Sequence, residues 1–430
     1  MSLSQAGLRT ANHPLRVMMY GNNLNMGDFI VSAFRRRGVA ATLLQVGQPV
    51  GQESRAWWTD RVEEGTMVFE VENEPIHWGR PQKLTTHRAI GQLYEQAKDA
   101  SVIMMMENGP ALFSELVNVP KVFLSQGADL QILPFKLFVD HHPTIIFSKL
   151  CRQPGKLFSW LRDFAHDAGL QFRQRRGLRQ CAAIICLPHQ QVLLKRLGLL
   201  NKPVYYCNFP MDPTLLQEWD RDFEEQLRRR YRDHDLIFFH PTRHFYLRTN
   251  NDAYLKDNDK LLRAFARFMS TTSKSCRLIL IEKGRPADLA HSRELVETLH
   301  LRDYVDWLPD MPNKKLRAIF MLDRVVVCDQ FSPRLAVLGN IGRETTYYGR
   351  PLITAFGDWN RLLYGNDWPP HVFPAESEDA ILQAMQRVAA APAEWWKQLQ
   401  IVARAWFDRH LHIDKIICQY LDVLQRVAKP

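Results

Sequence analysis

Short, continuous apolar runs alternate with segments of helical periodicity in the first half of the chain. A helix is expected over Gly27–Arg37, and residues 57–80 are less regular and are expected to add a hairpin. Strands that are apolar at every position must be covered on both faces, as in a parallel sheet between layers of helices. The expected strands are Leu15–Tyr20, Ala40–Val46, Ser101–Met106, Lys121–Leu124, Ala182–Leu187 and Val204–Cys207.

The alternation restarts after a charged helical segment, Asp212–Asp233, and from Glu378 onward only helices are expected. We therefore predict an α/β chain in which two doubly wound domains in series face each other across a cleft. The second set of expected strands is Leu236–His240, Arg277–Ile281, Tyr304–Leu308, Arg324–Cys328 and Pro351–Ala355. The helices expected between them are Asp257–Ser270, Ala287–His300 and Asn313–Met321.

Composition narrows the class of protein. Of 430 residues, 46% are hydrophobic and 24% charged, which excludes a disordered, collagen-like or fibrous chain. The net charge of +10 suggests an anionic partner: nucleic acid, acidic lipid or a phosphorylated small molecule. The excess is mild for this length, so a basic surface without function explains it equally well. No motif for DNA or RNA binding is present, and we expect no nucleic-acid partner.

The seven cysteines include no CxxC pair, so neither a disulfide framework nor a structural zinc site is expected. No stretch approaches the roughly 18 apolar residues that span a bilayer, and the first residues lack an apolar signal core. These features predict a cytoplasmic protein.

The loop Gly21–Gly27 follows the first expected strand and opens the first helix. Its glycines would let backbone N–H groups approach an anion at the helix N-terminus. The loop is not GxGxxG, and no acidic residue ends the second strand to hold a ribose, so a nicotinamide site is disfavoured. A tight structural turn explains the loop equally well.

Segments with polar or glycine-rich character fall at the C-terminal ends of strands, or at the starts of helices, in the second half. In doubly wound folds those positions line the ligand crevice. In chain order they are Phe239–Arg243 (FHPTR), Lys256–Lys260 (KDNDK), Ile281–Gly284 (IEKG), Asp306–Met311 (DWLPDM), Val327–Gln330 (VCDQ), Gly339–Thr346 (GNIGRETT) and Tyr348–Thr354 (YGRPLIT).

In that order the segments resemble the donor-binding domain of retaining, nucleotide-sugar-dependent glycosyltransferases with the GT-B fold, of the family 4 type (glycosyl transferases group 1). That family has an Arg after the first strand, a Lys opening the next helix, a V-x-W/F-L-P stretch, a Gly-rich loop with a Glu, and a G-x-P-L/V-I strand. In the first half, Ser125–Leu130 (SQGADL) resembles its H-G-S-D-L, and Asn208–Asp212 (NFPMD) its P-N-G-V-D. The resemblance covers roughly residues 15–390.

The resemblance implies an acceptor-side domain over 1–212, a donor-binding domain over 213–392, and C-terminal helices over 393–430 that pack back on the first domain. It implies a retaining, metal-independent transfer of a sugar from a nucleotide-diphosphate sugar (UDP-, GDP- or another) to an acceptor hydroxyl. The acceptor would be a glycan, a lipid-linked molecule or a cell-surface polysaccharide precursor. No cofactor and no metal site are implied.

Residue roles follow from the same resemblance. Arg243 and Lys256 would clamp the diphosphate and stabilise the charge that develops on the leaving group. Glu344 would begin a helix and accept hydrogen bonds from the ribose hydroxyls; an ordinary partner of the helix dipole is the alternative. Lys260 is the second choice for Lys256, and a surface ion pair is the alternative for Arg243. The remaining expected site residues are Gly27, Gly339, Gly342 and Thr345 on the donor side, and Asn25 and Asp129 on the acceptor side.

The sequence departs from the family pattern in three places. Asp257 follows the Lys where the family usually has Gly, and Gln126 stands where His is common. The first Glu of the family's E-x7-E is replaced by Ala336, although Asp329–Phe331 (DQF) resembles a branch that often lacks that Glu. The departure at Ala336 keeps a second hypothesis open, namely a non-catalytic GT-B-like scaffold subunit of a glycosyltransferase complex.

Two further segments have alternative explanations. Residues 149–180 carry an excess of six positive charges interleaved with aromatic residues. They fit either a peripheral helix on an anionic membrane, at its inner face, or a helix packed on its own sheet with a solvated basic face. Asp140–His142 fits a metal or acid–base site, but without an evident third ligand a polar loop is the simpler explanation.

Overall fold

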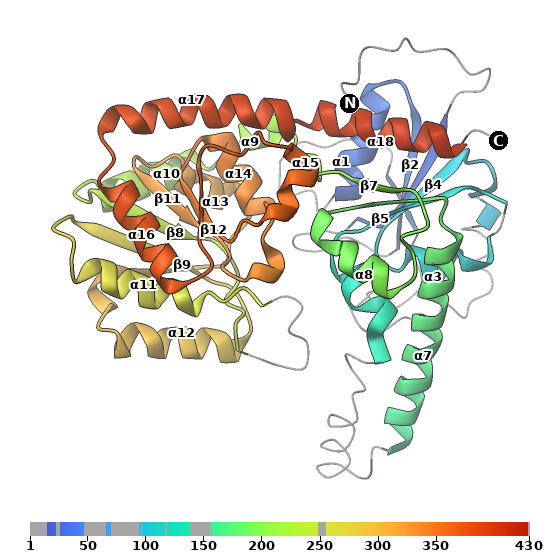
Figure 1. Cartoon of the computed structure of the whole chain (residues 1–430), viewed down its shortest axis with the longest axis horizontal. Helices are drawn as coiled ribbons and strands as arrows, with labels where there is room; N and C mark the ends of the chain where they lie inside the picture. Colours follow the sequence, from blue (N-terminus) through green and yellow to red (C-terminus); the bar gives the residue numbers. More distant parts are fainter. Residues whose placement is uncertain are drawn as a thin grey trace.

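The computed structural model describes residues 15–22, 26–46, 66–69, 94–95, 97–116, 118–137, 155, 157–247 and 255–428. Within them the chain forms two parallel sheets in two domains that lie side by side (Figure 1). The first sheet has seven strands in the order β3-β2-β1-β4-β5-β6-β7, and the second has six in the order β10-β9-β8-β11-β12-β13. The predicted α/β fold with two doubly wound domains is confirmed.

The strand bounds agree closely with the apolar runs. The first sheet comprises β1 (Arg16–Tyr20), β2 (Ala40–Val46), β3 (Thr66–Phe69), β4 (Val102–Met105), β5 (Lys121–Leu124), β6 (Ala183–Cys186) and β7 (Val204–Tyr206). The second comprises β8 (Leu236–His240), β9 (Cys276–Glu282), β10 (Val305–Pro309), β11 (Val325–Cys328), β12 (Leu352–Thr354) and β13 (Val372–Pro374). The prediction of a hairpin over 57–80 is wrong where the structure describes this stretch, at β3. This strand pairs in parallel with β2, with Leu43 opposite Thr66.

Helices connect the strands and cover both faces of each sheet. In the first domain they are α1 (Met26–Arg36), α3 (Gly109–Leu112), α4 (Ala128–Gln131), α7 (Leu157–Gln180) and α8 (Gln191–Arg196). The linking and second-domain helices are α9 (Pro213–Leu216), α10 (Arg221–Tyr231), α11 (Asp259–Met269), α12 (Pro286–Thr298), α13 (Asn313–Phe320), α14 (Asn340–Tyr348), α15 (Arg361–Tyr364) and α16 (Glu378–Ala389). The chain continues into α17 (Ala393–His410) and α18 (Ile413–Ala428).

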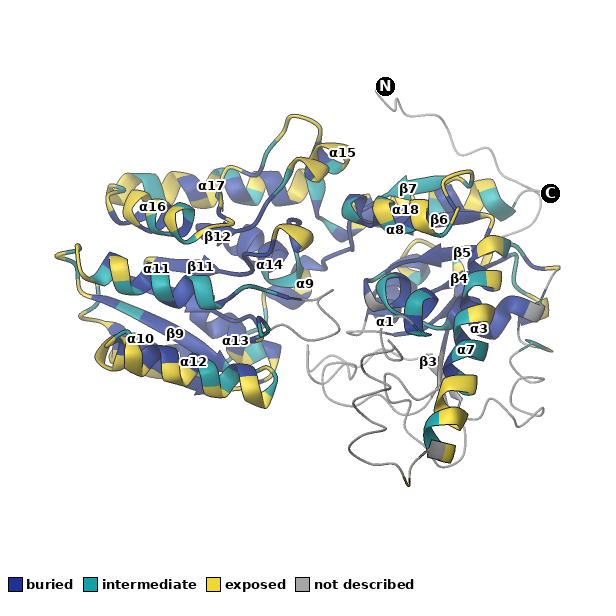
Figure 2. Cartoon of the chain, turned by 60° about the horizontal axis from the view of Figure 1, so that its bottom comes forward, coloured by how far each residue is buried: buried dark blue, intermediate teal, exposed yellow. Residues whose placement is uncertain are grey.

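Alternate residues of the central strands belong to separate cores on the two faces of a sheet. Figure 2 shows most of the strand residues as buried. In β1, Val17 and Met19 pack with α1 and α18, whereas Met18 and Tyr20 pack with α3, α7 and α8. In β8, Phe239 packs toward α10, α13, α14 and α17, while the other face packs on α11, α12 and α16. The two-sided burial explains why the strands contain no polar alternation.

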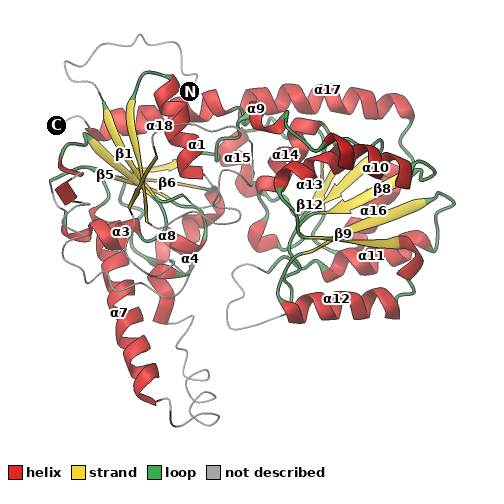
Figure 3. Ribbon diagram, turned by 180° about the vertical axis from the view of Figure 1, so that it is seen from behind, coloured by secondary structure: helices red, strands yellow, loops and turns green. Residues whose placement is uncertain are grey.

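The C-terminal helices join the two domains (Figure 3). Helix α17 packs on α14 of the second domain, and α18 then packs on α1, β4 and β5 of the first. The crossing point is fixed by Asn208, whose carbonyl accepts from the Tyr420 hydroxyl at 2.8 Å and whose side-chain oxygen accepts from the Tyr364 hydroxyl at 2.9 Å. The Arg343 guanidinium also donates to the Phe209 carbonyl at 3.1 Å. The NFPMD segment therefore lies at the contact between the domains.

Helix α7 is seated on the first domain by a glycine. A Cβ built on Gly177 would lie 1.7 Å from the Pro110 carbonyl oxygen, whereas one on Gly169, in the same helix, would meet nothing within 4 Å. We expect Gly177→Ala to destabilise the first domain by about 1–3 kcal/mol, because overpacking forces backbone shifts.

The matched variant Gly169→Ala should be neutral or slightly stabilising, since Ala favours the helix by up to about 1 kcal/mol. Thermal unfolding followed by circular dichroism checks both, and equal midpoints for the two variants would contradict the close packing of α7 on α3.

Candidate functional site

The second sheet reverses its strand order between β8 and β11, which are neighbours, while β9 and β10 extend to one side and β12 and β13 to the other. Ligands of doubly wound folds bind outside the carboxyl ends of the strands at such a point. The segments that follow β8 and β11 begin with Pro241–Arg243 and Asp329–Phe331. Arg243, one of the two residues expected to bind the diphosphate, therefore lies at the carboxyl edge of this sheet, beside the reversal of strand order.

Lys256 is held between those two segments by its backbone. Its N–H donates to the Phe245 carbonyl at 2.6 Å, and its carbonyl accepts from the Phe331 N–H at 2.8 Å. Its ammonium donates to the Gln330 side-chain oxygen. Burial lowers the pKa of Lys256 to about 8; the carboxylate of Asp329 opposes this shift and the neighbouring Arg243 adds to it. Lys256 is thus a positioned cation that titrates near neutral pH.

The conformation of the next residue explains the family's glycine. Asp257 has a φ of +52°, in the left-handed region that favours Gly and tolerates Asp. The second choice, Lys260, is engaged elsewhere: its ammonium pairs with Asp257 at 3.1 Å and donates to the Glu376 carbonyl at 2.8 Å. These contacts favour Lys256 over Lys260 as the cation of the site.

Arg243 is exposed at the end of the segment that follows β8. Among the described residues no carboxylate forms an ion pair with Arg243. The described part of the chain therefore gives no support to the alternative explanation of Arg243 as a member of a surface ion pair. Its charge is close enough to Lys256 to lower the pKa of that lysine. Lys256 therefore lies close to one other positive charge, that of Arg243, and to one carboxylate, that of Asp329.

A buried polar network fixes the ends of β8 and β11. The Nδ1–H of His240 donates to the Cys328 carbonyl at 2.7 Å, and the Asn258 amide donates to His240 Nε2 at 2.7 Å. Burial lowers the pKa of His240 to about 4, so the ring is neutral at pH 7. Thr242 donates its hydroxyl to the Asp329 carboxylate. His240 is thus a packed residue at the ends of β8 and β11. Thr242, Asn258 and Asp329 lie in segments that were expected to line the crevice, but no individual role was predicted for them from the sequence.

Helix α14 begins beside this network. Gly339 is its N-cap residue, and a Cβ there would lie 3.6 Å from the Asp329 carboxylate. The first N–H groups of a helix have no partner within it and carry partial positive charge. Gly342 has a packing role, because a Cβ would lie 3.0 Å from Leu338 and 3.4 Å from Leu352.

Thr345 is completely buried, and its hydroxyl donates back to the Ile341 carbonyl at 2.6 Å. It therefore contributes to α14 itself, and a role toward a donor stays a prediction.

Glu344 does not begin a helix, as the sequence predicted, but is the fifth residue of α14, in its second turn. The alternative explanation as a first-turn dipole partner is therefore wrong. Its side chain is 1% exposed and accepts from the Asn313 amide, at the start of α13, at 3.2 Å. Burial raises its pKa, against the opposing charges of Arg317 and Arg343. The carboxyl group is thus buried where the start of α13 approaches α14.

The position of the missing glutamate is occupied by a packed turn. Ala336 is 2% exposed, and its carbonyl accepts from the Gly357 N–H at 3.0 Å and the Asn360 amide at 2.8 Å. Its methyl group lies against Gly357, since a Cβ on that glycine would be 3.3 Å away. The position is thus occupied by a small, buried side chain.

In the first sheet the order reverses between β1 and β4, and the Gly21–Gly27 loop follows β1. A Cβ on Gly27 would lie 2.1 Å from the Gly21 carbonyl oxygen, so only glycine fits. The Asn22 side chain accepts from the Asp28 N–H at 2.9 Å and closes the turn. Asn25 lies outside the described residues. These contacts hold Gly21 and Asn22 against the start of α1, and ligand contacts of Gly27 stay a prediction.

Asp129 is buried at the end of β5, where its carboxylate holds the SQGAD loop. It accepts from the backbone N–H groups of Gln126 at 3.0 Å and Gly127 at 2.9 Å, and from the Ser125 hydroxyl at 3.1 Å. Burial raises its pKa, and these hydrogen bonds oppose the rise. Asp129 therefore shapes this loop, and its role on an acceptor side stays a prediction.

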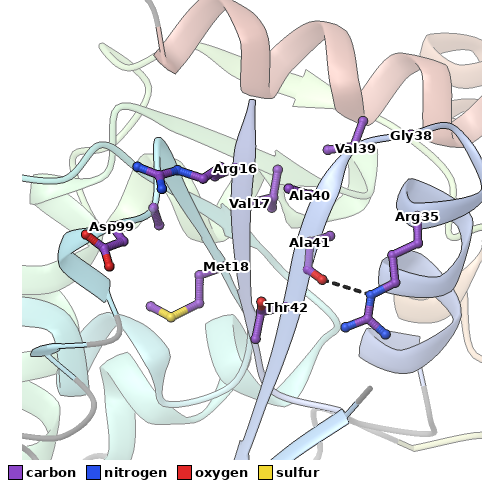
Figure 4. A pocket seen from close by; sticks show the side chains of 11 residues that line it. Arg16, Val17, Met18, Arg35, Gly38, Val39, Ala40, Ala41, Thr42 and Asp99 are labelled. Carbon is purple, nitrogen blue, oxygen red and sulfur yellow. Dashed lines mark hydrogen bonds between the residues drawn. The ribbon is translucent and has the colours of Figure 1, made fainter. Parts of the chain in front are cut away.

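One pocket of about 580 Å³ lies at the opposite edge of the first sheet, at the starts of β1 and β2 (Figure 4). Its lining includes Arg16, Asp99 and Arg35, the last of which donates to the Ala41 carbonyl at 2.9 Å. No residue expected to bind donor or acceptor lines it. In the described part of the chain no group of three or more His, Cys, Asp or Glu side chains could hold a metal, and Asp140–His142 lies outside that part.

Comparison with known proteins identifies the fold. No family model matches the sequence, and no curated protein matches it by sequence. Among solved structures, the chain is similar to sucrose-phosphate synthase from Thermosynechococcus elongatus (TM-score 0.62, 13% identity, 96% of this chain and 99% of that one). A glycosyltransferase from Rickettsia africae (0.66, 10%, 97% and 99%) and Anabaena HepE in complex with UDP (0.63, 11%, 96% and 100%) are similar over the same extent. The chain has the GT-B fold.

Proposed function

We propose that this chain is a glycosyltransferase that moves a sugar from a nucleotide-diphosphate sugar to an acceptor hydroxyl, with retention of configuration. The observation that carries the proposal is the pair of cations, Arg243 and Lys256, beside the N-terminus of α14 at the strand-order reversal of the second sheet. Structures of Anabaena HepE with UDP and with UDP-glucose, in the same fold, support a nucleotide sugar as the donor.

The chemistry of the proposal uses charge at the leaving group. The nucleoside diphosphate gains negative charge as the sugar leaves, and fixed cations and helix N–H groups stabilise it without reorganisation. Arg243 and Lys256 together outweigh the adjacent Asp329, so the site is net positive at pH 7. In this proposal they replace a divalent metal, and the transfer needs no cofactor.

Glu344 would accept hydrogen bonds from the ribose hydroxyls, with Asn313 holding its carboxyl group in place. Gly339 and Gly342 would border the phosphates, and Thr345 and Gly27 would complete the donor side. Asn25 and Asp129 would belong to the acceptor side. We place the donor domain at 213–392, between the acceptor domain at 1–212 and the crossing helices at 393–430, and closure of the two domains would exclude water.

The acceptor that we propose is lipid-linked or a cell-surface polysaccharide precursor. Its use would place the enzyme in the cytoplasm at the inner face of a membrane, in the biosynthesis of a glycan.

A thermal-shift screen against UDP, GDP, ADP, TDP and CMP, with and without EDTA, tests the proposal. A ligand at about 100 times its Kd adds about 2.7 kcal/mol of stability. We expect one diphosphate to raise the melting temperature whether or not EDTA is present. The isosteric variant Glu344→Gln should bind that diphosphate about tenfold more weakly, because a neutral amide is a poorer acceptor for two hydroxyls. No shift with any nucleotide would contradict the proposal.

The packed turn at Ala336 favours a second candidate function, a non-catalytic GT-B-like scaffold subunit. The scaffold predicts neither transfer nor release of diphosphate from any sugar nucleotide, even if a nucleotide binds. Diphosphate release from the sugar nucleotide selected by the screen separates the two candidates.

A further inference from the structure

Helix α7 leaves large apolar side chains in solvent. Phe158 is 86% exposed, Leu161 55% and Phe172 67%. These three residues come from a single helix of 24 residues, about 36 Å long at 1.5 Å per residue. Single exposed apolar residues are common on proteins, but a series along one helix marks an interaction surface.

The exposed side chains share one face of α7. At 100° per residue, Phe158, Leu161, Ala165, Phe172 and Arg176 fall within about 60° of one another. The buried residues of the helix lie opposite; they are Asp167, Leu170, Gln174, Gly177 and Leu178. We call the first group, together with its flanking residues Arg162, Arg173 and Arg179, the solvent face of α7.

The solvent face is basic as well as apolar. Arg162, Arg173, Arg176 and Arg179 are all exposed there. Of the two acidic residues of the helix, Asp163 is exposed and pairs with Arg162 at the border of this face, at 3.9 Å. Asp167 is buried beside Lys136, at 3.9 Å. The basic residues of the predicted segment that precede the helix, Lys149, Arg152 and Lys156, lie outside the described residues.

Among the described residues, the hydrogen bonds from α7 to the rest of the first domain come from its C-terminal half. Near its C-terminal end the Gln174 amide donates to the Glu107 and Asp129 carbonyls, at 3.0 and 3.3 Å, and Arg175 donates to the Pro134 carbonyl at 2.7 Å. The N-terminal half extends beyond both sheets in all three views of the chain (Figures 1–3). Packing of the helix on its own sheet therefore explains its C-terminal half but not its exposed aromatic end.

We propose that the solvent face of α7 binds the surface of an anionic membrane. Phe158, Leu161 and Phe172 would enter the boundary between head groups and acyl chains, and the arginines would meet lipid phosphates. Charge complementarity selects this occupant, because the face combines bulky apolar groups with four arginines, of which only Arg162 has an acidic neighbour on the helix, Asp163. In the described part of the chain no helix is long and apolar enough to cross a bilayer. Helix α7 would thus lie on the membrane.

Membrane binding has a consequence that rests on the proposed function. The C-terminal half of α7, which packs on the first domain, contacts the segments that follow β4 and β5, and these segments include Asp129. The acceptor side of the first domain would therefore be held next to the lipid surface.

Co-sedimentation with vesicles tests the membrane proposal. We expect the full chain to bind vesicles of phosphatidylcholine with phosphatidylglycerol, to bind pure phosphatidylcholine weakly, and to dissociate at high salt. The triple variant Phe158→Ser, Leu161→Ser, Phe172→Ser should bind at least tenfold more weakly. A control variant, Leu362→Ser with Ile401→Ser, removes side chains of similar exposure (52% and 64%) from α15 and α17, and should bind as the wild type does.

Charge is tested separately. Arg162→Gln, Arg173→Gln and Arg179→Gln should each reduce vesicle binding about fivefold, which corresponds to about 1 kcal/mol per arginine. The melting temperature and the affinity for the diphosphate should be unchanged in every variant. These two controls show that a loss of vesicle binding comes neither from misfolding nor from damage to the donor site. Wild-type protein that stays in the supernatant, or a triple variant that binds as tightly, overturns the proposal. So does a concentration-dependent dimer that the triple variant abolishes, since it would identify a second chain as the occupant.

Discussion

Replacing Lys256 by Met, or Arg243 by Ala, lowers kcat/KM for the sugar nucleotide by about 10²–10³. Each variant removes one fixed charge from the position where the leaving diphosphate becomes more negative. Met keeps most of the volume of the Lys256 side chain, whose backbone remains held by Phe245 and Phe331. The loss should therefore come from the charge and not from folding. Initial rates of diphosphate release, at several donor concentrations, measure it.

Lys260→Met is the matched control. Lys260 is four residues further along and carries the same charge, but its ammonium is paired with Asp257 and the Glu376 carbonyl. We expect its kcat/KM to stay within about threefold of the wild type, since a partly exposed ion pair is worth at most about 1 kcal/mol. Equal losses for Lys256→Met and Lys260→Met would show that the second choice of lysine, or general basic charge, explains the effect.

Affinity for the free nucleoside diphosphate falls by about tenfold per pH unit above pH 8, until the lysine of the complex also titrates. The diphosphate binds the protonated form of Lys256, whose pKa in the free protein is about 8. Binding raises that pKa, so a proton is taken up when the complex forms near pH 8. Calorimetric titrations in two buffers of different ionisation enthalpy measure the proton uptake.

Lys256→Arg should abolish both the proton uptake and the loss of affinity above pH 8, because arginine stays charged. The same lysine acts on folding with the opposite sign. Its pKa is lowered from the ordinary value of 10.5, so the unfolded chain binds more protons between about pH 8 and 10.5. Lys256 therefore makes the free energy of unfolding of the unliganded protein increase as the pH rises through that window. Affinity that is flat from pH 7 to 9 would place the diphosphate away from Lys256.

The sheets were predictable because most of their strands consist of nearly continuous apolar runs. Both faces of β1 and β8 are buried, so continuous apolar runs stand out from the helical periodicity around them. Strand β13 (Val372–Pro374) was not predicted, since three residues ending in Pro at a sheet edge give little pattern. Strand β3 was assigned to a hairpin, because nearness in sequence suggests an antiparallel partner, whereas it pairs in parallel with β2.

The candidate site was predictable where a local motif coincides with a strand end. Arg243 follows that rule, since it lies just after β8, whereas Lys256 was predicted from the start of the next helix, α11. The positive φ of Asp257 matches the glycine of the family pattern. Other features depend on distant pairings: Thr242 donates to Asp329, 87 residues away, and Asn313 donates to Glu344, 31 residues away.

No local pattern encodes such contacts. The place of Glu344 was missed by one helical turn, because the N-cap of α14 is a glycine whose side chain gives no capping signal.

The central claim is that a nucleoside diphosphate binds between β8 and β11, against Lys256. The most direct test is a calorimetric titration of UDP, GDP, ADP and TDP at pH 7 into the wild type, Lys256→Met and Lys260→Met. We expect one diphosphate to bind the wild type and Lys260→Met with similar Kd, and to bind Lys256→Met about a hundredfold more weakly. Binding of that diphosphate to Lys256→Met with wild-type affinity, or no binding of any of the four to the wild type, would contradict the claim.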